Sequence, residues 1–149
     1  IESLMTRILP RAAVITPNRM EAELLTGMTI RSLRDMESAA RLCREKFGCG
    51  SVIKGGHSES GEEAADVCLF GDELLILRSP RLNLPELTTH GTGCTFSSAL
   101  AAGVAKGLDL PDAARNAKHF VYASLLGHVR TGADLHSMFP PNLRKGFAD

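Results

Sequence analysis

The chain has 149 residues, 44% of them hydrophobic, and its 17 lysines and arginines balance its 17 aspartates and glutamates. A chain of this length supports one domain that buries roughly 70% of the surface exposed by its unfolded form. The even balance of charge argues against a broad basic surface for nucleic acid or a membrane, although one local site could still bind an anion.

The four cysteines and five histidines show no metal-binding pattern. Neither C-x-x-C nor H-x-x-x-H spacing occurs, which argues against a structural zinc site. The length of the chain and the lack of a secretory signal argue against a disulfide framework. No apolar stretch is long enough to span a bilayer. We therefore expect a reduced, cytoplasmic protein.

The first elements along the chain are a strand and two helices. Residues 12–16 (AAVIT) form a short apolar run, which predicts a buried strand. Asn18 follows as a helix N-cap, with Glu21 in the capping-box position, and this helix should end at Gly27. A second helix is predicted over residues 32–47, where apolar residues recur at helical spacing on one face.

A strand and a hairpin are predicted next. Residues 51–54 (SVIK) form a short strand, and residues 57–64 form a polar loop. Two apolar segments, 65–70 and 73–78, are joined by Gly71-Asp72. A two-residue connection of this kind predicts antiparallel strands.

The remaining chain is predicted to be a loop over 79–92 followed by two helices. The first helix runs from Gly93 or Cys94 to Lys106, and the second begins after Leu110 with proline in its first turn. Beyond Gly127 the pattern weakens into a proline-containing tail. The order of strand, helices, strand, hairpin and helices is that of an α/β protein.

The stretch THGTGCT contains the first candidate site. A helix N-terminus exposes amides without internal partners and carries partial positive charge, and glycines there let a phosphate approach the backbone. Gly91, Thr92 and Gly93 could therefore form an anion cradle, with the amides of Gly93, Cys94 and Thr95 pointing into it. A glycine turn before a helix is the alternative, since neither a dinucleotide fingerprint nor a P-loop is complete.

Cys94 adds a reactive group to this stretch. A helix N-terminus favours the thiolate form of a cysteine, so Cys94 could act as a base or a nucleophile. A nucleophilic cysteine would need a histidine to activate it, and His90 is near in sequence. The alternative is a small residue packed in the first helical turn.

Two further candidate positions follow predicted strands. Asn18 and Glu21 could hold Mg²⁺ through water, because ligands of open α/β sheets bind at the carboxyl ends of the strands. The alternative for this pair is the capping box alone. Lys54 ends a strand before two glycines and could contact nucleotide phosphates, or it could be an ordinary solvated lysine. A metal holder, a cation and an anion cradle together are what phosphoryl transfer requires.

Three segments in this order resemble a known family. VITPNRMEAELLTG, SVIKGGH and THGTGCTFSSALAAGVAKG are similar to the C-terminal half of hydroxymethylpyrimidine kinase/phosphomethylpyrimidine kinase, an enzyme of thiamine biosynthesis in the ribokinase-like superfamily. The resemblance covers about residues 5 to 128. The cysteine of THGTGCT is a strong marker of this family, because most sugar kinases of the superfamily have a Gly-Asp ending there.

The resemblance implies a fold, two reactions and roles for the candidate residues. The expected fold is a ribokinase-like three-layer α/β sandwich, whose central, mostly parallel sheet carries an antiparallel hairpin. The expected reactions are two successive ATP-dependent phosphorylations of the hydroxymethylpyrimidine substrate. Asn18 and Glu21 match the N-x-x-E motif near Mg²⁺, and Lys54 matches a phosphate-contacting lysine. Gly91–Gly93 match the anion hole, and Cys94 matches the base.

The chain differs from this family in length, since members are roughly twice as long. The start at residues 1–5 (IESLM) looks like the middle of a helix. We therefore expect residues 1–149 to be the C-terminal, ATP- and phosphate-binding part of a single kinase domain, without the half that contacts the pyrimidine and inactive alone. The tail at 130–149 is not placed by the resemblance. The full-length form is expected to be a homodimer.

Three alternatives remain open. The first is a pyridoxal kinase of the same superfamily, because GTGC does not separate these enzymes. The second is a non-catalytic ligand-binding or regulatory domain, although Asn18, Glu21, Lys54 and Cys94 are all intact. The third is a thiol hydrolase that uses Cys94.

Overall fold

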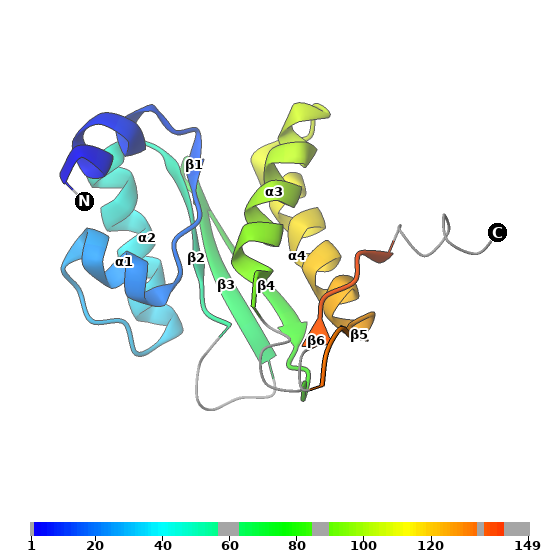
Figure 1. The fold of residues 1–149 in the computed structure, drawn as a ribbon. Helices are drawn as coiled ribbons and strands as arrows, with labels where there is room; N and C mark the ends of the chain where they lie inside the picture. Colours follow the sequence, from blue (N-terminus) through cyan, green and yellow to red (C-terminus); the bar gives the residue numbers. More distant parts are fainter. Residues whose placement is uncertain (1, 57–62, 85–89, 134–135, 142–149) are drawn as a thin grey trace. The chain divides into compact units, whose positions relative to one another are not determined.

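Strands and helices follow one another in the predicted order (Figure 1). The computed structural model describes residues 2–56, 63–84, 90–133 and 136–141. The chain divides into two compact units, Ile1–Arg78 and Ser79–Asp149, which we call the first and the second unit and describe separately.

A four-stranded sheet with the strand order β1-β2-β3-β4 organises the first unit. Its strands are β1 (Val14–Ile15), β2 (Gly50–Lys54), β3 (Glu63–Phe70) and β4 (Glu73–Pro80). β1 and β2 are parallel, whereas β2 and β3 are antiparallel. The neighbours β3 and β4 are joined by only Gly71-Asp72, a connection that suits antiparallel strands alone. The sheet is therefore mixed, and the predicted hairpin is present.

Two helices, α1 (Arg19–Thr26) and α2 (Leu33–Phe47), pack with this sheet in the first unit (Figure 1). Each begins with a complete capping box and ends at a glycine in the left-handed conformation, as the local sequence predicts for α1. The apolar face predicted for residues 32–47 is confirmed: Leu33 is half-buried, and the other members are buried, namely Met36, Ala39, Ala40, Cys43 and Phe47. The core of this unit contains Leu9, Ile15, Ala22, Leu25, Ile30, Met36, Ala39, Ala40, Cys43, Phe47, Cys49, Ile53, Val67 and Leu69.

The first residues of the chain are helical, as IESLM suggested. A π-helical turn, η1 (Leu4–Ile8), leads into a 3-10 turn, η2 (Leu9–Arg11). Leu9 is buried in the core of the first unit, so this segment packs with the rest of the unit.

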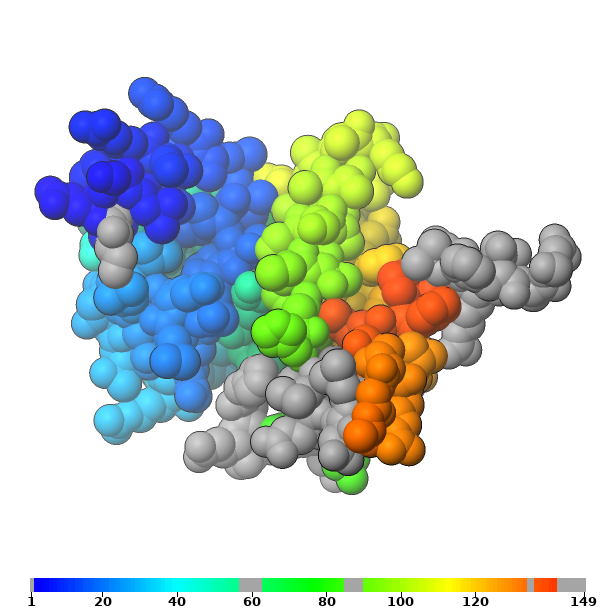
Figure 2. All heavy atoms as spheres, viewed as in Figure 1, coloured from blue at the N-terminus to red at the C-terminus, as the bar shows by residue number. Residues whose placement is uncertain are grey.

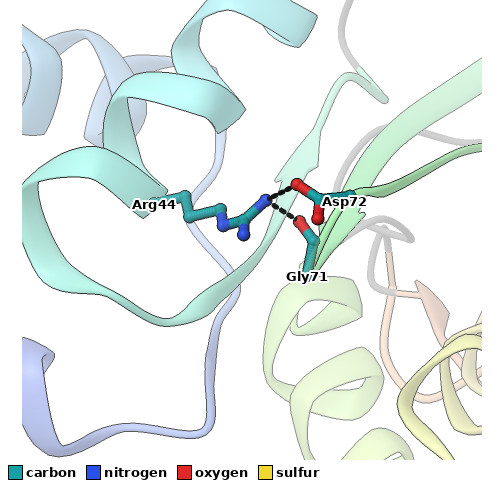
Figure 3. A network of polar contacts seen from close by, with 3 residues as sticks. All are labelled: Arg44, Gly71 and Asp72. Carbon is teal, nitrogen blue, oxygen red and sulfur yellow. Dashed lines mark hydrogen bonds and ion pairs between the residues drawn. The ribbon is translucent and has the colours of Figure 1, made fainter.

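A polar contact links α2 to the hairpin (Figure 3). One guanidinium nitrogen of Arg44 donates to the carbonyl of Gly71 and lies 2.6 Å from Oδ1 of Asp72. The arginine lowers the pKa of Asp72 through the hydrogen bond and its charge. Asp72 is almost fully exposed, so we assign this contact to the position of the turn rather than to the stability of the core.

Two packed helices, α3 (Thr92–Ala105) and α4 (Leu110–Leu126), form most of the second unit. A Cβ atom built on Gly103 would lie 3.1 Å from the Cβ of Ala113, which shows how closely the helices approach. Three buried alanines of α4, at positions 113, 114 and 117, make this approach possible. Pro111 lies in the first turn of α4, as predicted.

A small second sheet, β5 (Val129–Arg130) and β6 (His136–Ser137), was not predicted. Its strands pair antiparallel in the segment where the sequence pattern weakens. Two-residue strands are too short to show the alternation by which a strand is recognised in a sequence.

Several boundaries differ from the prediction. β1 is shorter than the predicted range 12–16, because only Val14 and Ile15 pair with residues of β2. β3 begins at Glu63, inside the predicted polar loop, and β4 extends to Pro80, inside the predicted loop over 79–92. The other parts of these loops at 57–62 and 85–89 lie outside the described residues.

Within the described ranges, no helix combines the length and apolar character needed to cross a membrane.

Candidate functional site

The first unit brings three of the predicted site residues together at one edge of its sheet. Asn18 and Lys54 form a parallel β-bridge just beyond β1 and at the end of β2. The amide of Lys54 donates to the carbonyl of Pro17 over 2.9 Å. Because β1 and β2 are parallel, their carboxyl ends meet, and Glu21 follows on the first turn of α1. Asn18, Glu21 and Lys54 therefore lie at the same end of this sheet.

Asn18 and Glu21 form the capping box that their spacing indicated. Oδ1 of Asn18 accepts from the amide of Glu21 at 2.9 Å, and Oε2 of Glu21 accepts from the amide of Asn18 at 2.7 Å. Both residues are exposed. The other carboxylate oxygen of Glu21 has no hydrogen bond or ion pair with a described residue. The cap therefore fixes the carboxylate and leaves one oxygen open to a ligand.

No dense metal cluster exists in the described parts of the chain. No group of three histidine, cysteine, aspartate or glutamate side chains is placed to hold an ion there. An all-protein metal cage is thus absent from the described residues, whereas Mg²⁺ typically keeps several waters and takes one or two carboxylates. Glu21 fits the second arrangement.

Lys54 is half-buried, and the backbone after it is held by a residue that the sequence did not single out. The amide of Gly55 donates to Oδ1 of Asp66 over 3.0 Å. Asp66 is only 5% exposed and pairs directly with Lys54 across β2 and β3. The available signal was an aspartate inside the otherwise apolar segment 65–70.

In the second unit, Gly91 is the N-cap of α3 and has φ of 84°. This left-handed conformation favours glycine. The helix therefore begins at Thr92, one residue earlier than predicted. No side chain caps this end, and the first hydrogen bond runs from the amide of Thr95 to the carbonyl of Gly91 at 2.9 Å.

One detail of the predicted anion cradle is wrong. The amide of Thr95 is already used in the first helical hydrogen bond, so it does not point into the cradle. The amides of Gly93 and Cys94 precede that bond and have no partner among the described residues. The open donors of the cradle are thus these two, which suit an anion at the helix N-terminus.

The segment after β6 lies next to this helix start. A Cβ atom built on Gly91 would be 3.7 Å from Cε of Met138. Figure 2 shows residues around Met138, in orange-red, beside the first residues of α3 in green. Part of the segment that the sequence left unassigned therefore forms the surroundings of the candidate cradle.

Cys94 is exposed, whereas Cys43, Cys49 and Cys68 are buried, and all four are free thiols. Burial raises the pKa of Cys43 to about 11, with the neighbouring Cys49 contributing in the same direction. Burial also raises the pKa of Cys49. Of the four, only the sulfur of Cys94 is placed to meet a reactant from solution.

The cysteine–histidine pair of a thiol hydrolase is not formed among the described residues. His90 is exposed and makes no hydrogen bond to Cys94 there. The described ranges thus contain no activating partner for Cys94 as a nucleophile. Asn18, Glu21 and Lys54 belong to the first unit, and Gly91–Cys94 belong to the second.

A protein-family profile described as phosphomethylpyrimidine kinase matches residues 1–139. The hydroxymethylpyrimidine/phosphomethylpyrimidine kinase of Haemophilus influenzae is 42% identical over 135 residues, which make up 89% of this chain and 49% of that protein. The chain spans about half the length of the curated relatives it matches.

Solved structures are similar over the same extent. A Bacillus subtilis pyridoxal kinase in an ADP complex has a TM-score of 0.86 and 34% identity, covering 96% of this chain and 53% of its own. The phosphomethylpyrimidine kinase of Clostridium difficile has a TM-score of 0.67 and 27% identity, covering 81% of this chain and 46% of its own. These similarities confirm the expected ribokinase-like α/β fold. Because the profile covers most of its length, the chain belongs to the phosphomethylpyrimidine kinase family.

Proposed function

We propose that the whole protein to which this chain belongs transfers phosphoryl groups from ATP to 4-amino-5-hydroxymethyl-2-methylpyrimidine and then to its monophosphate, in thiamine biosynthesis. The family match over residues 1–139, together with 42% identity to a kinase of that name, carries the proposal. Residues 1–149 are then the ATP- and phosphate-binding part of a single kinase domain.

The start of α3 supplies the anion site and the base in this proposal. The open amides of Gly93 and Cys94 bind the terminal phosphate, which Gly91 and Thr92 allow to approach the backbone. The hydroxymethyl oxygen forms a bond to the γ-phosphorus as the bond to ADP breaks. Its proton passes to the thiolate of Cys94, whose sulfur is exposed.

The end of the first unit's sheet supplies the positive charge. Lys54 contacts the phosphates as a point charge, beside Asn18. The carboxylate of Glu21, fixed by its cap and with one oxygen open, would hold Mg²⁺ together with Asn18 through water. The chemistry that Mg²⁺ would supply there is neutralisation of the negative charge of the phosphates.

The proposal extends to location and assembly. Four free thiols suit a reducing compartment, and we place the protein in the cytoplasm. We also propose a homodimer of the whole protein. Sedimentation of the purified whole protein tests this assembly, and a monomer over the working concentration range contradicts it.

A pyridoxal kinase is the second candidate, because the B. subtilis pyridoxal kinase structure has a TM-score of 0.86 to this chain. One preparation of the whole protein should be assayed for ADP release with the hydroxymethylpyrimidine, its monophosphate and pyridoxal, each with and without Mg²⁺. We expect turnover with both pyrimidines that stops when Mg²⁺ is chelated. A higher kcat/KM for pyridoxal would reverse the assignment, and no ADP release with any substrate would favour a non-catalytic domain.

A further inference from the structure

Asp66 is a buried carboxylate to which the proposed chemistry gives no role. It lies on β3 and is 5% exposed, whereas Val67 and Cys68, which follow it, are apolar and fully buried. A carboxylate taken out of water costs free energy unless hydrogen bonds satisfy it. Its position therefore needs a reason beyond filling space.

Hydrogen bonds hold the backbone of Lys54 and Gly55 in place, and one of them is accepted by Asp66. Oδ1 of Asp66 accepts from the amide of Gly55 over 3.0 Å, just where β2 ends. On the other side of the strand, the amide of Lys54 donates to Pro17 over 2.9 Å. The consecutive amides of Lys54 and Gly55 are thus hydrogen-bonded to acceptors on opposite sides of β2. The Cα atom of Lys54, which lies between these two amides, is therefore fixed.

Close packing reinforces this arrangement. A Cβ atom on Gly55 would lie 2.4 Å from the carbonyl oxygen of Ala65 and 2.8 Å from Cε of Met36. The backbone at Gly55 is therefore packed so closely against Ala65 and Met36 that no side chain fits there. Asp66 also pairs directly with Lys54 in the antiparallel register, and directly paired residues project from the same face of a sheet.

The side chain of Lys54 is by contrast not held by any residue in the described parts of the chain. Its ammonium makes no hydrogen bond or ion pair with any residue that the structure describes. A fixed Cα with an unengaged ammonium group is what a phosphate-binding lysine needs, because the backbone is ordered in advance and the charge is left for the ligand.

We propose that Asp66 is a positioning residue for nucleotide binding, which holds the Lys54–Gly55 backbone so that the ammonium of Lys54 reaches the phosphates. This rests on the proposed function, in which Lys54 contacts the phosphates of ATP. The recognised ligand class is a nucleoside triphosphate. Asp66 acts through the Gly55 amide and does not touch the ligand.

A double-mutant cycle tests the proposal. The measured quantity is the dissociation constant of the non-hydrolysable ATP analogue AMP-PCP for the whole protein. Asp66→Ala and Lys54→Ala should each weaken binding by about tenfold. The double variant should bind about as weakly as Lys54→Ala alone, because Asp66 acts through Lys54. Asp66→Asn, whose Oδ1 can still accept from the Gly55 amide, should stay within about threefold of the wild type.

Val67→Ala is the matched control for lost packing. It empties volume on the same strand, opposite Ile53 rather than Lys54. It should lower the unfolding midpoint while leaving the dissociation constant within about twofold. If Asp66→Ala does not fold, Asp66→Glu replaces it, since one added methylene displaces the acceptor and should weaken binding several-fold.

Additive losses in the cycle, an unchanged affinity for Asp66→Ala, or failure of Asp66→Asn to retain binding would each overturn the positioning role. These outcomes are separable from the proposed kinase activity, because AMP-PCP binding needs no turnover. A whole protein that binds AMP-PCP with the expected coupling but phosphorylates neither pyrimidine would refute the substrate and support the role of Asp66.

Discussion

At the scale of single residues, the start of α3 combines two features that separately would say little. Gly91 takes a left-handed conformation that lets the helix begin without a side-chain cap. Cys94, three residues later, presents the only exposed sulfur among the four cysteines. In the proposed reaction, the open amides of Gly93 and Cys94 would orient the phosphate, and the exposed thiol of Cys94 would accept the proton.

Replacing Cys94 by alanine should separate the two phosphorylations of the whole protein. The hydroxymethyl group must lose a proton on attack, whereas a phosphate monoester is already mostly ionised at neutral pH. We expect kcat for the first step to fall by about 100-fold or more and kcat for the second by less than about tenfold. Ser98→Ala, an exposed change one turn along α3, should leave both steps unchanged. Equal losses in the two steps would argue against Cys94 as the base.

Alanine substitutions at Gly55 and Gly56 form a matched pair that tests how closely the backbone beside Lys54 is packed. A Cβ atom on Gly55 would lie 2.4 Å from the backbone oxygen of Ala65, whereas one on Gly56 would meet nothing within 4 Å. We expect Gly55→Ala to lower the free energy of unfolding by about 1–3 kcal/mol, because backbone must move. Gly56→Ala should change it by less than about 1 kcal/mol. Urea unfolding measures both, and similar values would show that the sheet adapts easily.

At the scale of elements, capping chemistry determines where the helices of the first unit begin. In α2, Oδ2 of Asp35 accepts from the amides of Arg31 and Ser32, each over 2.9 Å, and from the hydroxyl of Ser32 over 2.8 Å. These bonds, chiefly that from Arg31, lower the pKa of Asp35 below its ordinary value of 3.8. The hydrogen bonds at the start of α2 therefore favour the ionised form of the Asp35 carboxylate.

The contribution of the Asp35 carboxylate to the stability of the first unit should decrease in acid. Because the pKa is lower in the folded state, the ionised group stabilises the fold fully above pH 3.8, and this contribution is lost as pH falls through the folded pKa. The difference in unfolding free energy between wild type and Asp35→Asn should shrink over that range. Urea titrations between about pH 6 and pH 2.5 measure it, with the exposed change Glu45→Gln as control. A difference independent of pH would exclude the carboxylate as its source.

At the scale of the whole molecule, the cysteines report on the integrity of the fold. Three are buried, and burial raises the pKa of Cys43 to about 11, so this thiol is protonated at pH 8. The reactive thiolate is thus suppressed at Cys43, and access is blocked at Cys43, Cys49 and Cys68 alike. Only Cys94 combines exposure with a helix N-terminus.

Iodoacetamide should therefore modify the folded chain once. At about pH 8 we expect complete alkylation of Cys94 before the other three react, and reaction of all four in denaturant. Peptide mass mapping at timed intervals measures the order. Cys94→Ser is the control, and it should leave the native chain unlabelled over the same interval. Early modification of Cys43 or Cys49 would mean that the core of the first unit opens readily.

Much of the local structure follows from neighbouring residues alone. Asn18 with Glu21 marks the start of α1, and Gly71-Asp72 marks the hairpin. Caps and tight turns can be predicted in this way because their partners lie within about four residues of one another. The motifs around Asn18, Lys54 and Cys94 were likewise sufficient to indicate the family, since they are short and contiguous.

The tertiary structure decided what depends on residues far apart in the chain. In the tertiary structure Asn18 pairs with Lys54, and Asp66 accepts a hydrogen bond from the amide of Gly55. Met138 lies next to Gly91. The structure also showed that the first turn of α3 uses the amide of Thr95, and that β5 and β6 pair. The physical reason is that strand register and side-chain packing are set by many weak contacts between distant segments, none of which leaves a periodic signal in the sequence.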